Sequence, residues 1–343
     1  MIEVALVILN YNGLNYLQKF IPGILEHLPP QAKLIVADNK SSDDSLKWLR
    51  TNHPQIELIE LKENHGFAKG YNLALAQLDH PYYLLLNSDV EVKEDFISPL
   101  LALLKSDDQI AAVQPKILSQ AQPDFFEYAG ASGGMKDYLA YTFCRGRIFD
   151  HCEKDTGQYE DSKEIFWASG AAFLIKSNLF RSFGGFDPDY FAHMEEIDLC
   201  WRLKNGGFKI MVEPSSKVYH VGGGTLNYSN PRKTYLNFRN SLRTIIKNEK
   251  TGKLWWLFPM RLFLDGLAAL QFLSKGKIKD IFAIIRAHWN VFTGLGTLSR
   301  KRKENKRLLE KFAFSKEANL NDVYEKSIIW QYYIKGKKKY PEL

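Results

Sequence analysis

Short apolar runs alternate with amphipathic stretches along the first third of the chain. Five runs are rich in Val, Ile and Leu and have the length of single strands: Val4–Leu9, Leu34–Ala37, Ile56–Leu61, Tyr82–Leu86 and Ile110–Val113. Between them lie four stretches with helical periodicity: Leu14–Leu28, Asp43–Thr51, Phe67–Leu78 and Asp95–Lys105. Fully apolar strands that alternate with such helices are typical of a parallel sheet covered on both faces. Because crossovers between parallel strands are right-handed, the pattern predicts a doubly wound α/β domain.

The pattern changes after residue 120. Residues 120–165 are rich in Gly, Tyr, Asp and Phe and have little periodicity, which predicts a loop-rich insertion with short strands. Order returns at Phe166–Lys176, and a helix is predicted over Glu195–Asn205, where Gly206-Gly207 ends it. Phe208–Val212 predicts a further strand.

From about residue 231 the chain is helical, aromatic and basic. Leu254–Leu273 is apolar on nearly all sides, Ile281–Leu298 repeats this pattern, and residues 300–307 read RKRKENKR. About 20 apolar residues could span a bilayer, but Pro259, Arg261 and Asp265 near the middle make spanning expensive. The alternatives are a helical subdomain packed on the α/β domain, a dimer interface, or contact with a membrane surface.

Composition narrows the classes only slightly. The 343 residues carry a formal net charge of +7, which is compatible with a nucleotide, a nucleic acid or a membrane surface as partner. The three cysteines form no CxxC pair, so we expect neither a disulfide framework nor a zinc site, and a reducing compartment. The apolar N-terminus is too short for a signal peptide and is interpreted as the first strand.

Polar residues follow three of the predicted strands. The first strand runs into Asn10-Tyr11-Asn12-Gly13, the second into residues 38–43 (DNKSSD), and the fourth into Asn87-Ser88-Asp89. Asp, Asn and Ser also serve turns and helix caps, and we favour capping for Ser41–Asp43. Ligands of open parallel sheets bind outside the carboxyl ends of the strands, so three such groups at one edge predict a polar-ligand site.

The kind of ligand is narrowed by the absence of glycine-rich cradles. The sequence contains neither GxGxxG after the first strand nor GxxxxGK[ST], so a Rossmann dinucleotide site and a P-loop are not indicated. A divalent cation that bridges a carboxylate and a diphosphate is another way to hold phosphates, and Asp89 could serve it.

A second acidic segment is His193-Met194-Glu195-Glu196-Ile197-Asp198. Three carboxylates within four residues repel one another, which raises pKa values and favours a general base. The structural alternative is a helix N-terminus with Asp198 paired to Arg202. His220, which precedes a glycine run, is either structural or a metal ligand.

Together these segments resemble glycosyltransferase family 2, the inverting enzymes of the GT-A fold, and in particular its bacterial rhamnosyltransferase-like members. The matching segments are VILNYNG (7–13), IVADNKSSDDS (35–45), NHGFAKGYNLAL (64–75), YLLLNSDVEV (83–92), WASGAAFLIK (167–176), GGFDPDYFAHMEEIDLCWRLKNGGFKI (184–210) and VYHVGGGT (218–225). They follow in the family's order over residues 1–225. Residues 234–248 (TYLNFRNSLRTIIKN) are similar to the helical segment that follows the domain in such proteins.

The resemblance implies roles for the strand-end residues. NSD at 87–89 stands where the family has its DxD motif, so Asp89 would coordinate Mg²⁺ or Mn²⁺ on the donor diphosphate, while Asn87 offers only a neutral oxygen. Asp38 matches the acid near the nucleotide base. The implied nucleotide-sugar-binding set is Asn10, Asn12, Asp38, Asn64, Gly66, Asn72, Asn87, Ser88 and Asp89.

The acidic segment matches the family's ED motif. Its second acid, the catalytic base, is here Glu196, one methylene longer than the usual Asp, and Glu195 is the alternative base. His220 matches a histidine that completes the metal site in some relatives. Gly170 lies where the acceptor pocket forms, and Asp198 is assigned to the acceptor side.

The fold and domains implied are a GT-A domain over residues 1–230, followed by a helical, basic region over 231–343 that is a candidate for membrane association. Residues 1–115 would form the nucleotide-binding half and 116–230 the acceptor and catalytic half. The implied location is cytoplasmic, peripheral at the inner face of the membrane, because Trp255-Trp256 and the basic ends suit an interface. A homodimer is the alternative use of these helices.

The implied reaction is inverting transfer from a UDP- or dTDP-linked sugar, dTDP-rhamnose among the candidates, to a glycan or polyprenyl-linked glycan in cell-surface polysaccharide synthesis. A non-catalytic nucleotide- or carbohydrate-binding family member is the alternative, since Asn87 and Glu196 depart from the motifs. A nucleic-acid partner is not expected, because no recognised binding motif accompanies the charge.

Overall fold

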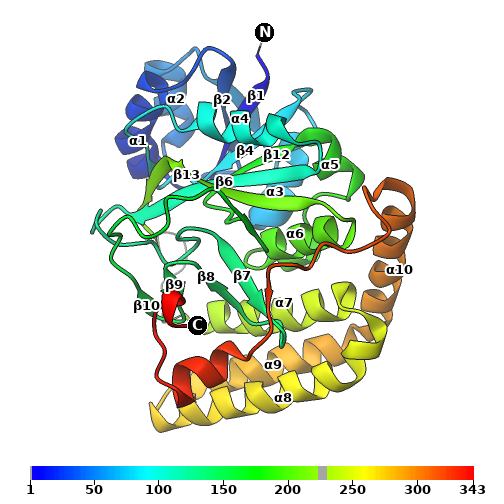
Figure 1. Cartoon of the computed structure of the whole chain (residues 1–343). Coiled ribbons are helices and arrows are strands. Elements are labelled where there is room, and N and C mark those ends of the chain that lie inside the picture. The colour runs from blue at the N-terminus through cyan, green and yellow to red at the C-terminus, as the bar shows by residue number, and fades with distance from the viewer. Residues whose placement is uncertain (1, 223–229) are drawn as a thin grey trace.

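The computed structural model describes residues 2–222 and 230–343 and places a central mixed sheet above a layer of helices (Figure 1). The sheet has the order β11-β13-β6-β12-β4-β1-β2-β3, and β5 pairs with β13 outside this path. Its strands are β1 (Val4–Asn10), β2 (Ala32–Asp38), β3 (Glu57–Glu60), β4 (Tyr82–Leu86), β5 (Val90–Glu91), β6 (Ile110–Ser119), β11 (Lys163–Ile165), β12 (Ala172–Lys176) and β13 (Lys209–His220).

The four strands β3, β2, β1 and β4 are parallel, as the apolar runs predicted. Strand β12 runs antiparallel between β4 and β6, so the sheet is mixed. A central strand buried on both faces is apolar in either direction, and periodicity therefore gave no sign of this reversal. Strands β6 and β13 are also longer than predicted, and β13 extends to His220.

Helices cover both faces of the sheet. Alternate residues of β1 point to opposite sides, with Leu6 in one buried cluster that includes Leu17 and Val7 in another that includes Tyr71 and Ile197. The helices of this domain are α1 (Leu14–Glu26), α2 (Ser45–Asn52), α3 (Gly66–Leu75), α4 (Ile97–Ser106), α5 (Ser177–Ser182), the 3₁₀ turn η1 (Pro188–Tyr190) and α6 (Glu195–Asn205). Two buried layers on one sheet give the predicted α/β fold.

The insertion predicted over 120–165 forms most of a second sheet with the order β10-β9-β8-β7-β14. Its strands are β7 (Gly134–Asp137), β8 (Thr142–Cys144), β9 (Arg147–Ile148), β10 (His151–Cys152) and, from the far end of the chain, β14 (Val323–Tyr324). The C-terminal segment thus returns to the insertion (Figure 1). All three cysteines are free.

Helices α7 to α10 form the predicted C-terminal helical region, and α7 packs against α6 of the sheet domain. Their bounds are α7 (Pro231–Asn248), α8 (Thr251–Ser274), α9 (Ile278–Thr293) and α10 (Leu295–Phe312), followed by η2 (Trp330–Ile334) and η3 (Tyr340–Glu342). In Figure 1, α7, α9 and α8 lie below the sheet domain, and α10 rises along its side.

Candidate active site at the strand ends

The ends of β1 and β2 meet as predicted. Asn10 and Asp38 are register partners and are both buried. The Asn10 amide donates to Asp38 Oδ2 and to Ser41 Oγ, each at 3.1 Å. Asn12, in the left-handed conformation, accepts from the Ser42 N–H at 2.7 Å. Asn10 Oδ1 is buried and has no hydrogen-bond partner among the described residues, so it is available to a ligand.

Ser88, which follows β4, lies near Gly13 and Asn10 at the end of β1. A Cβ added at Gly13 would lie 2.4 Å from Asn10 Oδ1 and 3.5 Å from Ser88 Oγ. Glycine at this position therefore keeps the Asn10 oxygen uncovered, and Ser88 Oγ borders the same space.

Asn64 and Gly66 form the turn that begins α3. The Gly66 N–H donates to Asn64 Oδ1 at 2.9 Å, and the buried Asn39 donates to both Asn64 Oδ1 and Gly66 O. Gly66 has φ +72°, and a Cβ there would come within 2.6 Å of the Phe191 ring. Sequence reasoning missed Asn39, whose role depends on a contact 25 residues away.

Asn72, predicted to lie on the nucleotide side, is not brought to the strand ends. Its side-chain amide donates to Phe186 O at 2.7 Å and accepts from Phe186 N–H at 2.9 Å. These bonds fix α3 to the loop that precedes η1. The amide spacing in the sequence could not distinguish this structural use from ligand binding.

Asp89 and His220 come together, although 131 residues separate them. Strand β5 pairs with the end of β13, with Val90 opposite His220. His220 Nε2 lies 3.1 Å from Asp89 Oδ1 and 3.4 Å from the Asn87 amide nitrogen. Both Asp89 and His220 are buried, at 7% and 5% exposure.

Glu127, from the insertion, is a residue that sequence reasoning missed. Its Oε2 lies 3.3 Å from His220 Nδ1, so the imidazole sits between two carboxylates. Burial lowers the pKa of His220, but hydrogen bonds and charges from Asp89 and Glu127 outweigh it and raise the pKa to about 10. A carboxylate behind a metal-binding histidine is the usual way to fix its orientation.

The Asp89–His220 pair fits a divalent cation that brings further ligands with it. Among residues 2–222 and 230–343, no cluster of three or more His, Cys, Asp or Glu side chains is arranged to hold a metal. Two buried donors, a carboxylate and an imidazole whose proton would have to leave, supply only part of a coordination shell. Hard cations such as Mg²⁺ complete their shells with phosphate oxygens and water, so the pair suits an ion bound to a diphosphate.

Glu195 and Glu196 begin α6 beside the fourth strand end. The Glu196 carboxylate accepts a backbone hydrogen bond from Gly170, and Ala171 O accepts from Asn87 N–H at 3.0 Å. One oxygen of each glutamate, Oε2, is buried without a hydrogen-bond partner among the described residues. A Cβ at Gly170 would lie 3.1 Å from the Phe67 ring and 3.9 Å from the Glu196 carboxyl carbon. A side chain at this position would therefore press on Phe67 and contact the Glu196 carboxyl group.

The two glutamates differ in exposure and in acidity. Burial raises the pKa of Glu196 to about 7. Burial and the charge of Glu196 raise the pKa of Glu195 well above its usual range. Glu195 is 4% exposed and Glu196 is partly exposed. A carboxylate with a pKa near 7, on the more exposed residue of the two, suits proton transfer at neutral pH, and this favours Glu196 over Glu195 as a base.

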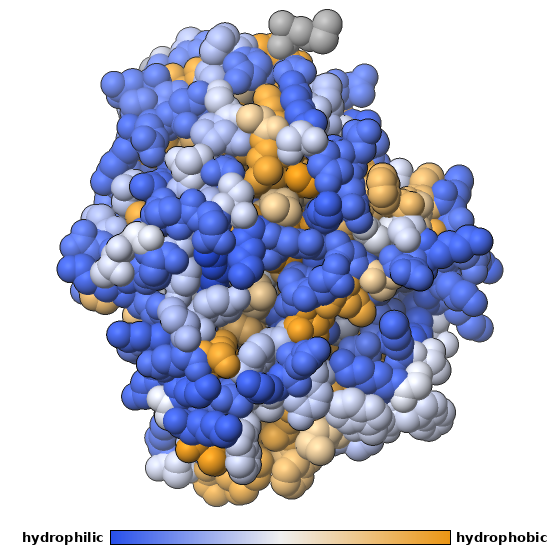
Figure 2. Space-filling view, viewed as in Figure 1, coloured by the Kyte–Doolittle hydropathy of each residue, from blue (hydrophilic) through white to orange (hydrophobic). Residues whose placement is uncertain are grey.

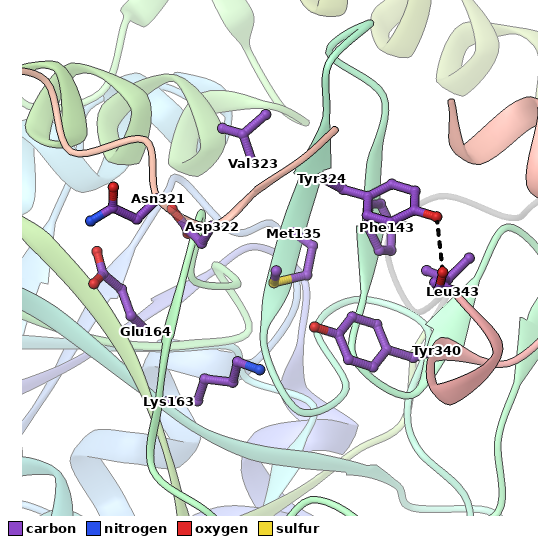
Figure 3. Close-up of a pocket in the computed structure, with 10 residues that line it drawn as sticks. All are labelled: Met135, Phe143, Lys163, Glu164, Asn321, Asp322, Val323, Tyr324, Tyr340 and Leu343. Atoms are coloured by element: carbon purple, nitrogen blue, oxygen red, sulfur yellow. Dashed lines mark hydrogen bonds between the residues drawn. The ribbon is translucent and has the colours of Figure 1, made fainter. Parts of the chain in front are cut away.

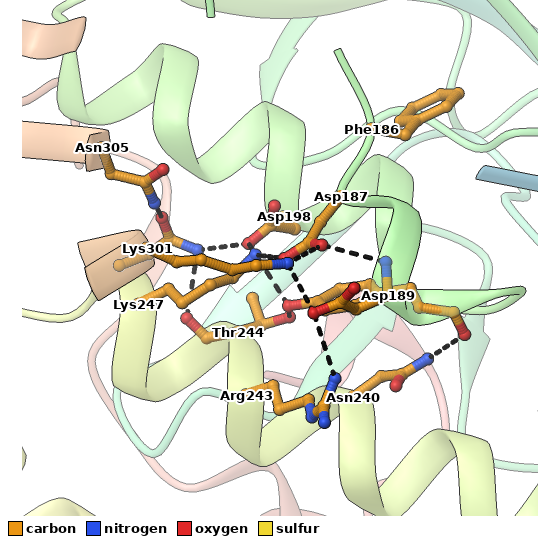
Figure 4. A network of polar contacts seen from close by, with 12 residues as sticks. Phe186, Asp187, Asp189, Asp198, Asn240, Arg243, Thr244, Lys247, Lys301 and Asn305 are labelled. Atoms are coloured by element: carbon orange, nitrogen blue, oxygen red, sulfur yellow. Dashed lines mark hydrogen bonds and ion pairs between the residues drawn. The ribbon is translucent and has the colours of Figure 1, made fainter. Parts of the chain in front are cut away.

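Asp198 follows the structural alternative. It is fully buried, and its carboxylate lies 3.0 Å from Arg202 Nη2 and 2.9 Å from Lys247 Nζ. Asn248 donates to it as well, at 2.7 Å. Figure 4 shows this network between α6 and α7, with Lys301 and Asn305 approaching from α10. The structure does not bring Asp198 to the strand ends.

A cavity of about 470 Å³ lies elsewhere, between the second sheet and the C-terminal segment (Figure 3). Met135, Phe143 and Tyr324 give it an apolar wall, and Asp322 lies at its edge. None of the predicted site residues lines it.

A mixed α/β sheet that collects amide and carboxylate groups at its strand ends, beside a pair of glutamates with raised pKa values, is the arrangement expected of a GT-A glycosyltransferase. The model for Glycosyl transferase family 2 matches residues 5–184, and the chain belongs to this family. The predicted GT-A fold and family are confirmed.

The relatives include two proteins named as rhamnosyltransferases. The chain is 24% identical over 283 residues to N-acetylglucosaminyl-diphospho-decaprenol L-rhamnosyltransferase of Mycobacterium tuberculosis, which covers 77% of this chain and 90% of that protein. It is 25% identical over 227 residues to rhamnosyltransferase WbbL of Escherichia coli K12, covering 63% and 83%. A solved mannosyltransferase of Pyrobaculum calidifontis, in complex with GDP-Man and Mn²⁺, superposes with a TM-score of 0.52 at 15% identity, covering 92% and 88%. The chain is therefore a family 2 glycosyltransferase of rhamnosyltransferase-like type.

Proposed function

We propose that this enzyme transfers a sugar, with inversion, from a UDP- or dTDP-linked donor to a hydroxyl of a lipid-linked glycan, and that dTDP-rhamnose is the first donor to test. The observation that carries the proposal is the Glu196 side chain: the residue is partly exposed, and one buried carboxylate oxygen has no hydrogen-bond partner among the described residues. Its carboxylate accepts from the backbone of Gly170, and the next residue, Ala171, accepts from Asn87 at the fourth strand end. The rhamnosyltransferase names of the two curated relatives favour rhamnose, and the decaprenol-linked substrate in the name of one of them favours a polyprenyl-linked acceptor.

On the donor side, Asp38, Asn10 and Asn12 would bind the nucleoside, and the turn at Asn64 and Gly66 would border it. Asp89 and His220, with the Asn87 amide beside them, would hold Mg²⁺ or Mn²⁺ with the diphosphate. When bound, such an ion neutralises charge on the diphosphate leaving group. The Mn²⁺ in the mannosyltransferase complex supports this assignment.

On the acceptor side, Glu196 removes the proton of the attacking hydroxyl. The oxygen forms a bond to the anomeric carbon while the bond from that carbon to the diphosphate oxygen breaks on the opposite face. The proton stays on Glu196, the leaving group carries the negative charge, and the configuration inverts in one displacement. Burial and the charge of Glu196 raise the pKa of Glu195, so an ionised Glu196 disfavours a second charge in the pocket.

A membrane surface is the proposed partner of α8 and α9, because charged side chains of α8 are buried while large apolar side chains of both helices face outward. The last charged residues of α8, Arg261 and Asp265, are 4% and 2% exposed, and they bond to Leu139 O and to His288. Large apolar side chains face outward instead: Trp255, Met260, Phe263, Leu267, Leu270 and Leu273 on α8, and Ile278, Phe282, Ile285, Trp289 and Phe292 on α9. Figure 2 shows apolar surface gathered at this lower end of the molecule.

Length and composition alone would let α8 cross a membrane. Its buried charges instead bind other parts of the protein, so we propose that the helix pair lies on the surface of the cytoplasmic leaflet. Exposed lysines at the turn between α8 and α9, Lys275, Lys277 and Lys279, suit anionic lipid headgroups. This location would present the enzyme to a lipid-linked acceptor.

Turnover tests the reaction. The purified chain is mixed with dTDP-rhamnose, UDP-sugars or GDP-mannose and a short-chain polyprenyl diphosphate N-acetylglucosamine, with Mn²⁺ or with EDTA. We expect metal-dependent product from one donor and inverted stereochemistry by NMR. Metal-dependent donor binding without transfer to any acceptor would instead support a non-catalytic binding protein.

Vesicle binding tests the membrane face. We expect the chain to sediment with vesicles that contain anionic lipid, and the variant Phe263→Asp/Trp289→Asp to stay in solution. The variant Arg300→Asp/Lys303→Asp, on α10, is the control for charge. A stable dimer in solution that Phe263→Asp/Trp289→Asp dissociates, without vesicle binding by the wild type, would assign the face to a second copy of the chain.

A further inference from the structure

The loop immediately before the catalytic glutamates has an unusual backbone. Phe191, His193 and Met194 have φ values of 66°, 70° and 75°, although none of them is glycine. Side-chain-bearing residues rarely adopt this left-handed conformation, and a loop keeps it only where surrounding contacts hold it. Glu195 follows directly, so the position of Glu196 depends on what holds this loop.

A single buried amide on α7 binds three carbonyl groups of the loop. Asn240 is fully buried. Its Nδ2 donates to Tyr190 O at 3.2 Å, to Ala192 O at 3.0 Å and to His193 O at 2.8 Å. Helix α7 thereby satisfies backbone groups that a left-handed loop leaves without partners of its own.

Arg239 fixes the direction of that amide. Its Nε donates to Asn240 Oδ1 at 2.8 Å, so the NH₂ group must face the loop. Arg239 Nη2 also donates to Asp189 O and Tyr190 O, each at 3.0 Å. The two side chains act as one clamp on residues 189–193.

The opposite side of the loop rests on the nucleotide side of the site. Phe191 O accepts from Phe67 N–H at 2.7 Å, at the first turn of α3. Because Gly66 has no side chain, the Phe191 ring can approach the backbone at this position. The loop is therefore held between α3, beside the donor turn, and α7, in the C-terminal region.

We propose that Asn240 is a positioning residue for Glu196, and that α7 therefore belongs to the catalytic unit although it follows the sheet domain in sequence. Only the kcat measurement in its test depends on the proposed function, because the hydrogen-exchange measurement needs no turnover. It assigns to the helical region a task beyond packing and membrane contact.

The test compares two buried asparagines of α7. Asn240→Ala removes the clamp, and Asn248→Ala removes a similarly buried amide that bonds to Asp198 and Thr244 O instead. For Asn240→Ala we expect kcat to fall about 10- to 100-fold, since a small misplacement of a catalytic group costs about this much, with donor KM changed less than about threefold. We expect amide hydrogen exchange in residues 191–196 to accelerate about tenfold or more in Asn240→Ala only.

Equal losses of kcat in both variants, with unchanged exchange in residues 191–196, would overturn the proposal. If Asn240→Ala does not fold, Arg239→Gln removes the group that orients the amide and should show the same pattern in milder form. If the wild type transfers no sugar, the exchange measurement still decides whether Asn240 holds the loop, and the failure then belongs to the proposed reaction.

Discussion

Glu196 and Asp198 lie two residues apart on the same helix, yet their surroundings are opposite. Asp198 is fully buried and bonded to Arg202, Lys247 and Asn248. Glu196 has backbone hydrogen bonds only, and one of its oxygens has no partner among the described residues. Leaving a buried polar atom unpaired costs free energy, so a protein keeps one where a ligand will supply the partner.

The network around Asp198 shows what a structural use of charge looks like. Lys247 lies 2.6 Å from Asp187 and 2.9 Å from Asp198, and Lys301 of α10 joins Asp187 and Asp189 (Figure 4). Burial raises the pKa of Asp187, but the two lysines hold it well below its usual range. Paired charges here join α6, η1, α7 and α10. At the strand ends, by contrast, Asn10, Glu195 and Glu196 each keep one buried oxygen without a hydrogen-bond partner among the described residues. On helix α6 this difference separates a structural carboxylate from a candidate catalytic one.

Removing Lys247 from the ion-pair network around Asp198 should give the largest loss of stability. Lys247→Met leaves Asp187 and Asp198 with less compensation in the interior, and we expect the free energy of unfolding to fall by about 3–5 kcal/mol. Urea denaturation followed by circular dichroism measures this. Lys253→Met, which removes a partly exposed pair with Glu249, should cost no more than about 1 kcal/mol. Equal losses in both variants would contradict a special role for the network.

Removing the carboxylate at the fourth strand end should weaken metal-dependent nucleotide binding. For Asp89→Asn we expect the Mn²⁺-dependent gain in affinity for UDP or dTDP to fall by more than about 100-fold, because a direct ligand should matter more than its supports. Calorimetry with Mn²⁺ and with EDTA measures the gain. Asp79→Asn, a fully exposed carboxylate, is the control. Nucleotide binding that keeps its metal dependence in Asp89→Asn would remove Asp89 from the metal site.

The raised pKa of Glu196 predicts opposite pH trends for activity and stability. Activity needs the ionised base, so kcat/KM should rise with pH and level off above about 7. The folded state binds this proton more tightly than the unfolded state does. Its stabilising effect is complete below the unfolded pKa of about 4.3 and is lost as pH rises through about 7.

Glu196→Gln should therefore be more stable than the wild type, and the difference in the free energy of unfolding should grow by on the order of 1–3 kcal/mol from pH 5 to pH 8. Denaturation at the two pH values measures the difference. Glu63→Gln, an exposed carboxylate, should show no such trend. A constant difference for Glu196→Gln would mean that its carboxyl is not perturbed.

Glu127 gives the smallest expected effect on the site. An amide can still accept from His220 Nδ1–H but carries no charge, so Glu127→Gln should weaken Mn²⁺ binding in the presence of nucleotide by about tenfold. Electron paramagnetic resonance of free Mn²⁺ measures it without turnover. Asp124→Asn, an exposed carboxylate of the same segment, should leave the affinity unchanged. Unchanged affinity in both would make Glu127 purely structural.

Local signals explain which parts of the fold were predictable. Helix α6 begins at Glu195 and ends at Asn205 as predicted, because acids at its start and glycines after its end are read from neighbouring residues. Strand β4 was likewise delimited by its apolar run. The direction of β12 and the extension of β13 to His220 depend on pairing with distant strands, which local periodicity does not encode.

The candidate site was likewise predictable only where a local rule places its residues. Asn10 and Asp38 meet because parallel strands end at one edge, a rule that needs no coordinates. The roles of Asn72, Glu127 and Asn240 rest on contacts between residues 47 to 114 positions apart. An Asn or Glu in a sequence has the same donors and acceptors whether it binds a ligand or a backbone carbonyl, and only the partner tells them apart.

The most direct measurement compares Glu196→Gln with Asp198→Asn for both kcat and the free energy of unfolding at pH 7. We expect a crossed result. Glu196→Gln loses about 10²–10⁴-fold in kcat and is at least as stable as the wild type, whereas Asp198→Asn loses about 3–5 kcal/mol of stability and keeps kcat per folded molecule within about threefold. Full turnover by Glu196→Gln, or loss of turnover by fully folded Asp198→Asn, would contradict it.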